Sequence, residues 1–244
     1  MEKAKRKKRD VGQRFGDSSA TYDEVATVQR SAALRLAAEA SRWIPQGASV
    51  LEIGCGTGTL TEAIARACRP KRMIINDLSD KMLSAAISRT AHFAPGTDVT
   101  PWEADAETTE WPAADVIVSA SAAQWFASPL RFVSKAARAL PRGGTVALVT
   151  YGPQTFKELR GGEPNSYPTL EEWGAEFKKN GFDIKLSGRT FETQHFASRT
   201  SMLRMMAMSG IGTRLPGQST ANLGGVSELT WEILSLVALL GSIP

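Results

Sequence analysis

The chain is organised around the segment Leu51-Glu52-Ile53-Gly54-Cys55-Gly56-Thr57-Gly58. An apolar run over residues 50–53 leads into it, and a helical pattern over residues 60–67 follows, which predicts a strand, a tight glycine turn and a helix. Glycines accept positive φ angles and let a ligand lie against the main chain, while the first turn of the helix offers free N–H groups. We therefore interpret this turn as the cradle of a small polar ligand.

The spacing of the glycines indicates the class of ligand. Dinucleotide-binding turns follow G-x-G-x-x-G, but Thr59 and Thr61 stand where a series starting at Gly54 or Gly56 would need its third glycine. The turn reads G-x-G-x-G instead, with Glu52 two places before the first glycine. This arrangement resembles the first motif of the class I methyltransferases that depend on S-adenosylmethionine (SAM).

Composition describes an ordinary globular protein of 244 residues, 42% hydrophobic and 22% charged, long enough for one large α/β domain or two small ones. No apolar run reaches the ~20 residues of a membrane span, and the polar residues 11–20 do not form the apolar core of a signal peptide. Two cysteines and two histidines are too few and too scattered for a disulfide framework or a metal site. We expect a cytoplasmic monomer without a bound metal or a membrane partner.

The net charge of +4 has one source, because residues 1–10 carry six basic and two acidic side chains and the remainder balances. Such a run is typical of a solvated, disordered tail, or of a segment that attracts an acidic partner. The chain has neither zinc-finger spacing nor an aromatic-basic sheet signature, so no nucleic-acid partner is expected. We therefore predict a tail over residues 1–10 and one domain over residues 11–244.

The rest of the chain alternates between expected strands and helices. Strands are expected at residues 49–54, 72–76, 98–103, 115–119, 145–151, 182–196 (one strand or a pair) and 228–239 (where a helix is the alternative). Helices are expected at residues 31–43, 58–68, 78–89, 128–140, 169–180 and 198–208, with a capping box from Thr169 to Glu172. This order predicts an α/β fold with a seven-stranded, mostly parallel sheet and helices on both faces.

Acidic and aromatic residues follow the expected strands at the edge where open α/β sheets bind ligands. Asp77 follows Gly56 by about twenty residues, the offset at which a carboxylate accepts from two ribose hydroxyls, although it could also be a helix N-terminal acid. Asp105, after the third strand, is our candidate acceptor for the adenine amino group. After the fourth strand, Trp125 and Phe126 belong either to the ligand site or to the core.

Further segments resemble one family, the malonyl-acyl carrier protein O-methyltransferases of biotin synthesis. The resemblance rests on Arg-Phe-Gly at 14–16, Ala-Thr-Tyr-Asp at 20–23, Gln-Arg at 29–30, Asn-Asp-Leu-Ser at 76–79, Ala-Asp-Ala-Glu at 104–107, Gln-Trp at 124–125, Met-Leu-Arg at 202–204 and Gly-Ile-Gly at 210–212. The segment between residues 212 and 229 is shorter than is usual in that family, which leaves the fit of its lid to the substrate open.

The resemblance implies a Rossmann-like class I methyltransferase with a helical cap from residues 11–45 and 198–225. It also implies SAM as cofactor and, as substrate, the free carboxylate of a malonyl group on the acidic acyl carrier protein, methylated early in biotin synthesis. The expected cofactor-binding residues are Tyr22, Glu52, Gly54, Cys55, Gly56, Asp77, Leu78, Met82, Asp105, Ala106, Ser119 and Gln124.

A carboxylate substrate sets modest chemical demands. It is ionised at pH 7, so the enzyme needs no general base and works by positioning and by excluding water. A cation must hold the carboxylate, and arginine does so with two hydrogen bonds. Our candidate is Arg204, which would otherwise be an exposed helix arginine above a buried methionine face (Met202, Met205, Met208), with Trp125 as a second positioning residue and Arg160 as the next cation to consider.

Two other functions remain open at this point. The chain could methylate another small carboxylic acid or a carbon nucleophile, and a carbon nucleophile would more often need a base. It could also bind SAM without turnover and act as a partner protein.

Overall fold

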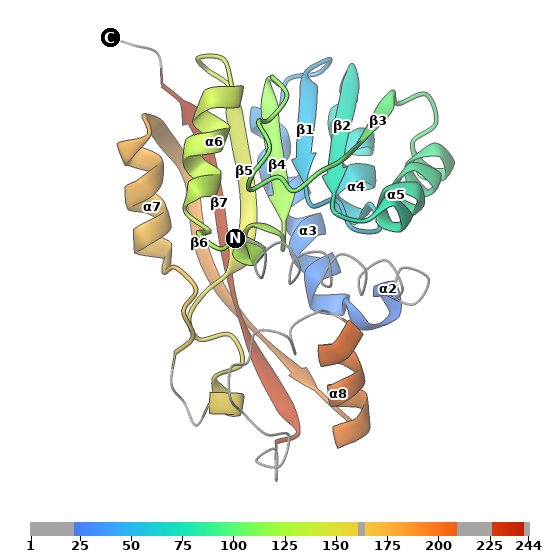
Figure 1. Ribbon diagram of the computed structural model, residues 1–244, viewed down its shortest axis with the longest axis vertical. Helices are drawn as coiled ribbons and strands as arrows, with labels where there is room; N and C mark the ends of the chain where they lie inside the picture. The colour runs from blue at the N-terminus through green and yellow to red at the C-terminus, as the bar shows by residue number, and fades with distance from the viewer. Residues whose placement is uncertain (1–21, 161–163, 209–225, 242–244) are drawn as a thin grey trace.

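The computed structural model describes residues 22–160, 164–208 and 226–241. A seven-stranded sheet forms its centre, in the order β3-β2-β1-β4-β5-β7-β6 (Figure 1). The strands are β1 (Ser49–Ile53), β2 (Arg72–Asp77), β3 (Val99–Glu103), β4 (Val116–Ala120), β5 (Thr145–Tyr151), β6 (Phe182–His195) and β7 (Glu228–Leu240). The first five are parallel, and β7 runs antiparallel between β5 and β6. The predicted α/β sheet is thereby confirmed.

Helices cover both faces of this sheet. They are α2 (Tyr22–Val25), α3 (Thr27–Ala40), α4 (Thr59–Cys68), α5 (Asp80–Phe93), α6 (Arg131–Ala139), α7 (Leu170–Lys179) and α8 (Arg199–Met208), with short 3-10 turns η1 (Ser41–Trp43), η2 (Ala123–Trp125) and η3 (Lys157–Arg160). The capping box of α7 is present as predicted, because the Glu172 N–H donates to the Thr169 hydroxyl at 3.1 Å and the Thr169 N–H to the Glu172 carboxylate at 2.7 Å.

Alternating residues of the strands pack into two separate hydrophobic cores, one on each face of the sheet. In β1, Val50 packs toward α3, α4 and α5, whereas Leu51 and Ile53 pack toward the α6 and α7 side. All three side chains are at most 1% exposed, and burying such a side chain stabilises the fold by about 1.5–3 kcal/mol. These paired cores fix β1, and with it the glycine turn at its carboxyl end.

The last two strands form one long hairpin. Residues 182–195 are a single strand rather than a pair, and residues 228–240 pair on both sides, which excludes the helical alternative. The hairpin reaches beyond β5, because β5 pairs only with residues 233–239 of β7. Trp231 fills this extension against Tyr151 and Phe156, which explains how a segment with few β-branched residues holds a strand.

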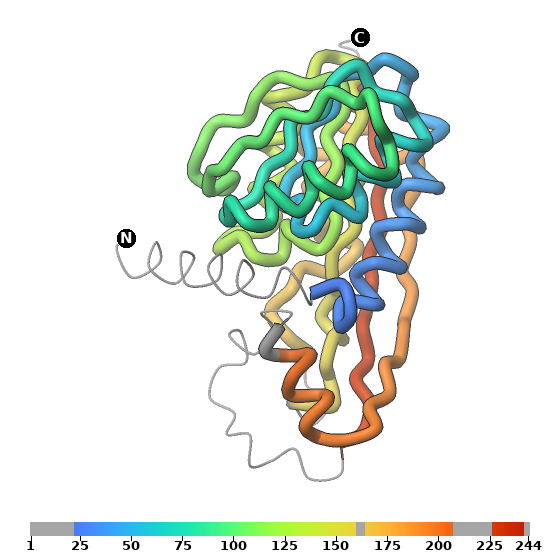
Figure 2. The backbone as a smooth tube through the Cα atoms, turned by 90° about the vertical axis from the view of Figure 1, so that its right-hand side faces the viewer, coloured from blue at the N-terminus to red at the C-terminus, as the bar shows by residue number. Residues whose placement is uncertain are grey.

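Helices α2 and α8 lie beyond the carboxyl ends of the parallel strands (Figure 1). Figure 2 shows α8 at the far end of the β6–β7 hairpin with α2 nearby, and the two helices are in contact. Parts of the predicted cap, at residues 11–21 and 209–225, and the basic tail at residues 1–10 lie outside the described residues, so the domain division stays a prediction. None of the described helices is long and apolar enough to cross a membrane.

Candidate active site

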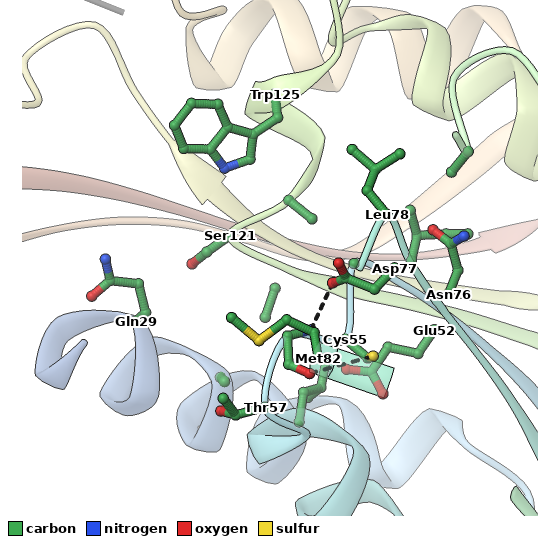
Figure 3. A pocket seen from close by; sticks show the side chains of 18 of the residues that line it. Gln29, Glu52, Cys55, Thr57, Asn76, Asp77, Leu78, Met82, Ser121 and Trp125 are labelled. Atoms are coloured by element: carbon green, nitrogen blue, oxygen red, sulfur yellow. Dashed lines mark hydrogen bonds between the residues drawn. The ribbon is translucent and has the colours of Figure 1, made fainter. Parts of the chain in front are cut away.

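A cavity of about 560 Å³ opens at the carboxyl ends of β1, β2 and β4. Its walls come from the glycine turn, from the segments that follow β2, β3 and β4, and from α2 and α3. Figure 3 shows Asp77, Leu78 and Asn76 on one side of this cavity and Gln29, Ser121 and Trp125 on the other. The strand order brings these distant segments to one edge, as predicted for an open parallel sheet.

Two glycines of the turn, Gly54 and Gly58, leave no room for a side chain. At Gly54, with φ of +72°, a Cβ would lie 2.2 Å from the Cβ of Ala122, and at Gly58, with φ of +87°, it would lie 2.6 Å from the Ala86 backbone. Gly54 therefore lets the turn touch the segment after β4, and Gly58 lets α4 pack against α5. A Cβ at Gly56 would meet no atom within 4 Å, so this side of the turn is open to a ligand.

Asp77 lies beside this turn with both carboxylate oxygens oriented by the backbone. The Gly56 N–H donates to Oδ2 at 3.0 Å and the Ser79 N–H to Oδ1 at 3.1 Å. Burial raises the pKa of Asp77 to about 6, although these hydrogen bonds oppose the increase. Each oxygen keeps a lone pair for a further donor, as the pair of ribose hydroxyls would require.

Glu52 also lines the cavity, but its carboxyl group is held by a hydrogen bond within the protein. It is 1% exposed, and the Thr61 hydroxyl donates to its Oε2 at 2.6 Å, which joins β1 to α4 across the turn. Burial raises the pKa of Glu52 to about 8, so its carboxyl group is mainly protonated at neutral pH. Cys55 is buried in the same turn, and burial raises the pKa of its thiol far above the usual value.

The segment after β3 supplies the wall where the adenine was expected. Asn76 holds this segment against β2, because its side-chain amide donates to the carbonyls of Trp102 and Ala104 at 3.0 and 2.9 Å. Asp105 and Ala106 line the cavity there, as do Leu78 from the β2–α5 connection and Met82 from the first turn of α5. Their placement agrees with an adenosine site, and their individual roles stay predictions.

Two expected cofactor residues do not line the cavity. Ser119 is fully buried and donates to the Ile53 carbonyl at 2.8 Å, which ties β4 to β1. The Gln124 amide donates to the Ser121 carbonyl at 2.5 Å and accepts from the Thr150 hydroxyl at 3.1 Å. Both residues support the site from behind, whereas Ser121, which the sequence reading passed over, faces the cavity.

Helix α2 is fastened to the glycine turn by a cluster of polar contacts. Asp23 forms an ion pair with Arg89 of α5 and accepts from the Thr57 hydroxyl at 2.6 Å, and Arg89 also donates from Nε to the Thr57 carbonyl at 2.9 Å. The same helix places Tyr22 in the cavity wall, where burial and the nearby Asp77 raise the pKa of its phenol. The sequence showed Asp23 only as part of a motif, with no signal for its partner.

The residues predicted to position the substrate are separated in the structure. Trp125 and Phe126 line the cavity, and Phe126 also belongs to the core, so both interpretations of Phe126 hold at once. Arg204 is exposed on α8, lies 3.7 Å from Glu24 of α2 and is not part of the cavity wall. Met202 and Met205 are buried beneath it, and the side chains of Met208 and Arg160 lie outside the described part of the chain.

Comparison with known proteins agrees with this geometry. Residues 50–144 match a family described as a methyltransferase domain. A phosphoethanolamine N-methyltransferase of Haemonchus contortus, solved with S-adenosylhomocysteine, superposes with a TM-score of 0.55 at 21% identity, over 85% of this chain and 52% of that protein. This likeness supports the fold alone.

Sequence relatives identify the family. A malonyl-[acyl-carrier protein] O-methyltransferase of Bacteroides fragilis is 31% identical over 82% of this chain, which spans 41% of that protein's length. The protein of the same name from Bacteroides thetaiotaomicron is 30% identical, with 82% of this chain and 77% of the relative covered. The chain therefore belongs to the malonyl-[acyl-carrier protein] O-methyltransferase family, within the SAM-dependent methyltransferases, and its cofactor is SAM.

Proposed function

We propose that this chain methylates the free carboxylate of a malonyl group carried by an acyl carrier protein, as the names of its Bacteroides relatives suggest. When bound, SAM supplies a methyl group on a positively charged sulfur. The proposed residues for its ribose and adenine are Asp77 and Asp105, with Tyr22, Leu78 and Met82 around them.

The observation that carries the proposal is the character of the cavity away from Asp77. Its described wall there contains Gln29, Ser121 and Trp125, and the basic side chain in the described wall is Arg30. An arginine stays protonated and cannot remove a proton from a substrate, and the Asp23 carboxylate in this wall is engaged by Arg89 and by the Thr57 hydroxyl. Such a wall suits a nucleophile that arrives already ionised, which is the state of a malonyl carboxylate at neutral pH.

Positioning and partial exclusion of water are then the protein's contribution. The transfer joins a carboxylate oxygen to the methyl carbon, while the electrons of the broken carbon–sulfur bond stay on sulfur, so no proton moves. The two opposite charges of the reactants neutralise each other in this step, so the transition state carries less charge than the separated ions. A site with little water therefore destabilises the transition state less than it destabilises the separated ions. The half-buried Trp125 and the buried Phe126 and Met82 provide such surroundings in the described wall.

The direct test uses SAM with malonyl-carrier protein and, in parallel, acetyl-carrier protein, which lacks the free carboxylate. Mass spectrometry should show one added methyl on the malonyl carrier and none on the acetyl carrier. Methylation of free dicarboxylic acids in preference to the carrier would instead favour the broader small-acid function. SAM binding without transfer to any acceptor would favour the non-catalytic alternative.

A further inference from the structure

One stripe of α3 faces the cavity. Ala26, at its N-cap, and Gln29, Arg30 and Ala33 follow the spacing i, i+3, i+4 and i+7, which places them along one side of a helix. The two alanines leave room above the helix, so the polar side chains between them can meet a ligand. Gln29 is 8% exposed, and its Oε1 has no hydrogen-bond partner among the described residues. This oxygen is a hydrogen-bond acceptor, so a buried amide of this kind is costly unless a donor group of a ligand completes its hydrogen bond.

Arg30 differs from several other arginines of the described chain, because it has no ion-pair partner there. Arg35, Arg89, Arg189 and Arg204 all pair with carboxylates. Within the ranges the structure describes, Arg30 is the single basic residue of the cavity wall and has no carboxylate partner. Its charge is therefore available to an anion that enters the cavity.

Ser121 faces the same part of the cavity in an unusual conformation. Its φ is +56°, a region that residues other than glycine rarely occupy. Its N–H donates to the Val149 carbonyl at 2.9 Å, and its own carbonyl accepts from the Gln124 amide. Backbone strain of this kind persists where the surroundings hold it, and it concentrates at functional sites.

The hydroxyl of Ser121 is oriented as well. It lies 2.8 Å from the Tyr151 hydroxyl, and burial raises the pKa of Tyr151 far above its usual value, so the phenol keeps its proton and can donate it to Ser121. The Ser121 proton is then free to point elsewhere. The following residue, Ala122, abuts Gly54 of the glycine turn, so Ser121 lies next to the cofactor side of the cavity.

We propose that Arg30 and Ser121 hold the reacting carboxylate of the acyl substrate. Arg30 supplies the charge and Ser121 donates to one carboxylate oxygen, which leaves the other oxygen directed at the methyl group. This assignment rests on the proposed function only in assuming that the group that receives the methyl is a carboxylate. It assigns to Arg30 the role predicted from the sequence for Arg204.

The test compares Arg30→Ala, Arg30→Lys, Ser121→Ala and Ser121→Gly with Arg138→Ala, a control on the exposed side of α6. Arg30→Ala should lower kcat/KM for malonyl-carrier protein about tenfold or more, with Arg30→Lys intermediate, while SAM affinity changes less than about twofold. Ser121→Ala and Ser121→Gly should lose equal activity, although glycine suits the positive φ and should raise the melting temperature. If the two variants lose the same activity although they differ in stability, the loss is caused by the missing hydroxyl and not by the change in backbone strain.

A second measurement separates failure of this proposal from failure of the proposed function. With S-adenosylhomocysteine bound, the wild type should bind malonyl-pantetheine about tenfold more tightly than acetyl-pantetheine, and Arg30→Ala should lose that preference. This readout needs no turnover, so it holds even if the wild type methylates no carrier. The proposal is overturned if Arg30→Ala keeps the preference, if it weakens SAM binding instead (which would assign Arg30 to the cofactor's own carboxylate), or if only Arg204→Ala abolishes the preference.

Discussion

At the scale of single residues, Asp77 links the cofactor site to pH. Its pKa is raised to about 6, and a ribose diol needs the ionised carboxylate as acceptor, so a proton must leave before SAM binds well at low pH. We expect SAM affinity to be constant above about pH 7 and to fall as the pH decreases through 6. Asp77→Ala should weaken binding by about 1–3 kcal/mol.

Isothermal titration calorimetry between pH 5 and 8 checks this prediction, with Asp77→Asn as the control that cannot titrate. The variant should bind weakly and show a flatter pH profile. An unchanged SAM affinity in folded Asp77→Ala would remove the ribose assignment.

Glu52 predicts a second pH effect, this time on stability. Its pKa is raised from 4.5 to about 8, so between these values the folded protein holds a proton that the unfolded chain releases. The free energy of unfolding should therefore decrease as the pH rises from about 4.5 to about 8 and level off above it. Asp77 contributes with the same sign between about 4 and 6.

Urea denaturation of the cofactor-free protein across this range measures the slope, and Glu52→Gln should make it shallower. Glu110→Gln, at an exposed carboxylate, is the matched control and should keep the wild-type slope. A slope that Glu52→Gln leaves unchanged would mean that Glu52 is ionised in the folded protein.

At the scale of elements, the ion pair between Asp23 and Arg89 fastens α2 over the glycine turn. Both side chains are partly buried, so we expect Arg89→Ala to destabilise the protein by about 1 kcal/mol. It should also weaken SAM binding several-fold, because α2 carries Tyr22 in the cavity wall. Lys179→Ala is the control, since Lys179 pairs with Glu176 on its own helix α7 and shares no partner with Arg89.

Calorimetry of both variants measures the effect, and a cycle with Asp23→Asn isolates the pair. If Arg89→Ala and Lys179→Ala bind SAM equally well, α2 does not contribute to the cofactor site.

Elements were more predictable than side-chain directions. The pattern of apolar residues and the positions of the glycines were sufficient to predict the strands. The sequence offset between Gly56 and Asp77 correctly predicted that the two residues lie next to each other. Side-chain directions after β4 could not be predicted: Ser119 bonds to the Ile53 carbonyl behind the cavity wall, whereas Ser121 lines the cavity with a positive φ, a conformation without a sequence signature. The choice between Arg30 and Arg204 likewise depends on how α3 and α8 pack, which local patterns do not encode.

At the scale of the whole molecule, the excess positive charge of residues 1–10 is opposite in sign to the charge of the proposed acidic partner, the acyl carrier protein. We predict that this segment speeds encounter with the carrier at low salt, and that the effect fades as ionic strength passes ~0.15 M, where the Debye length is about 8 Å. Deletion of residues 1–10 should then lower kcat/KM at low salt and leave kcat unchanged. Equal rates for both proteins at low salt would leave the segment without a role in encounter.

The central claim is that the methyl group reaches a carboxylate oxygen of a carrier-bound malonyl group. The most direct measurement follows a carbon-13 methyl group from labelled SAM into malonyl-carrier protein by NMR. We predict that the malonyl carrier, and not the acetyl carrier, shows the resonance of an ester O-methyl group that mild base releases as methanol. A label on carbon that survives base, or SAM that binds while the label never leaves it, would contradict the account.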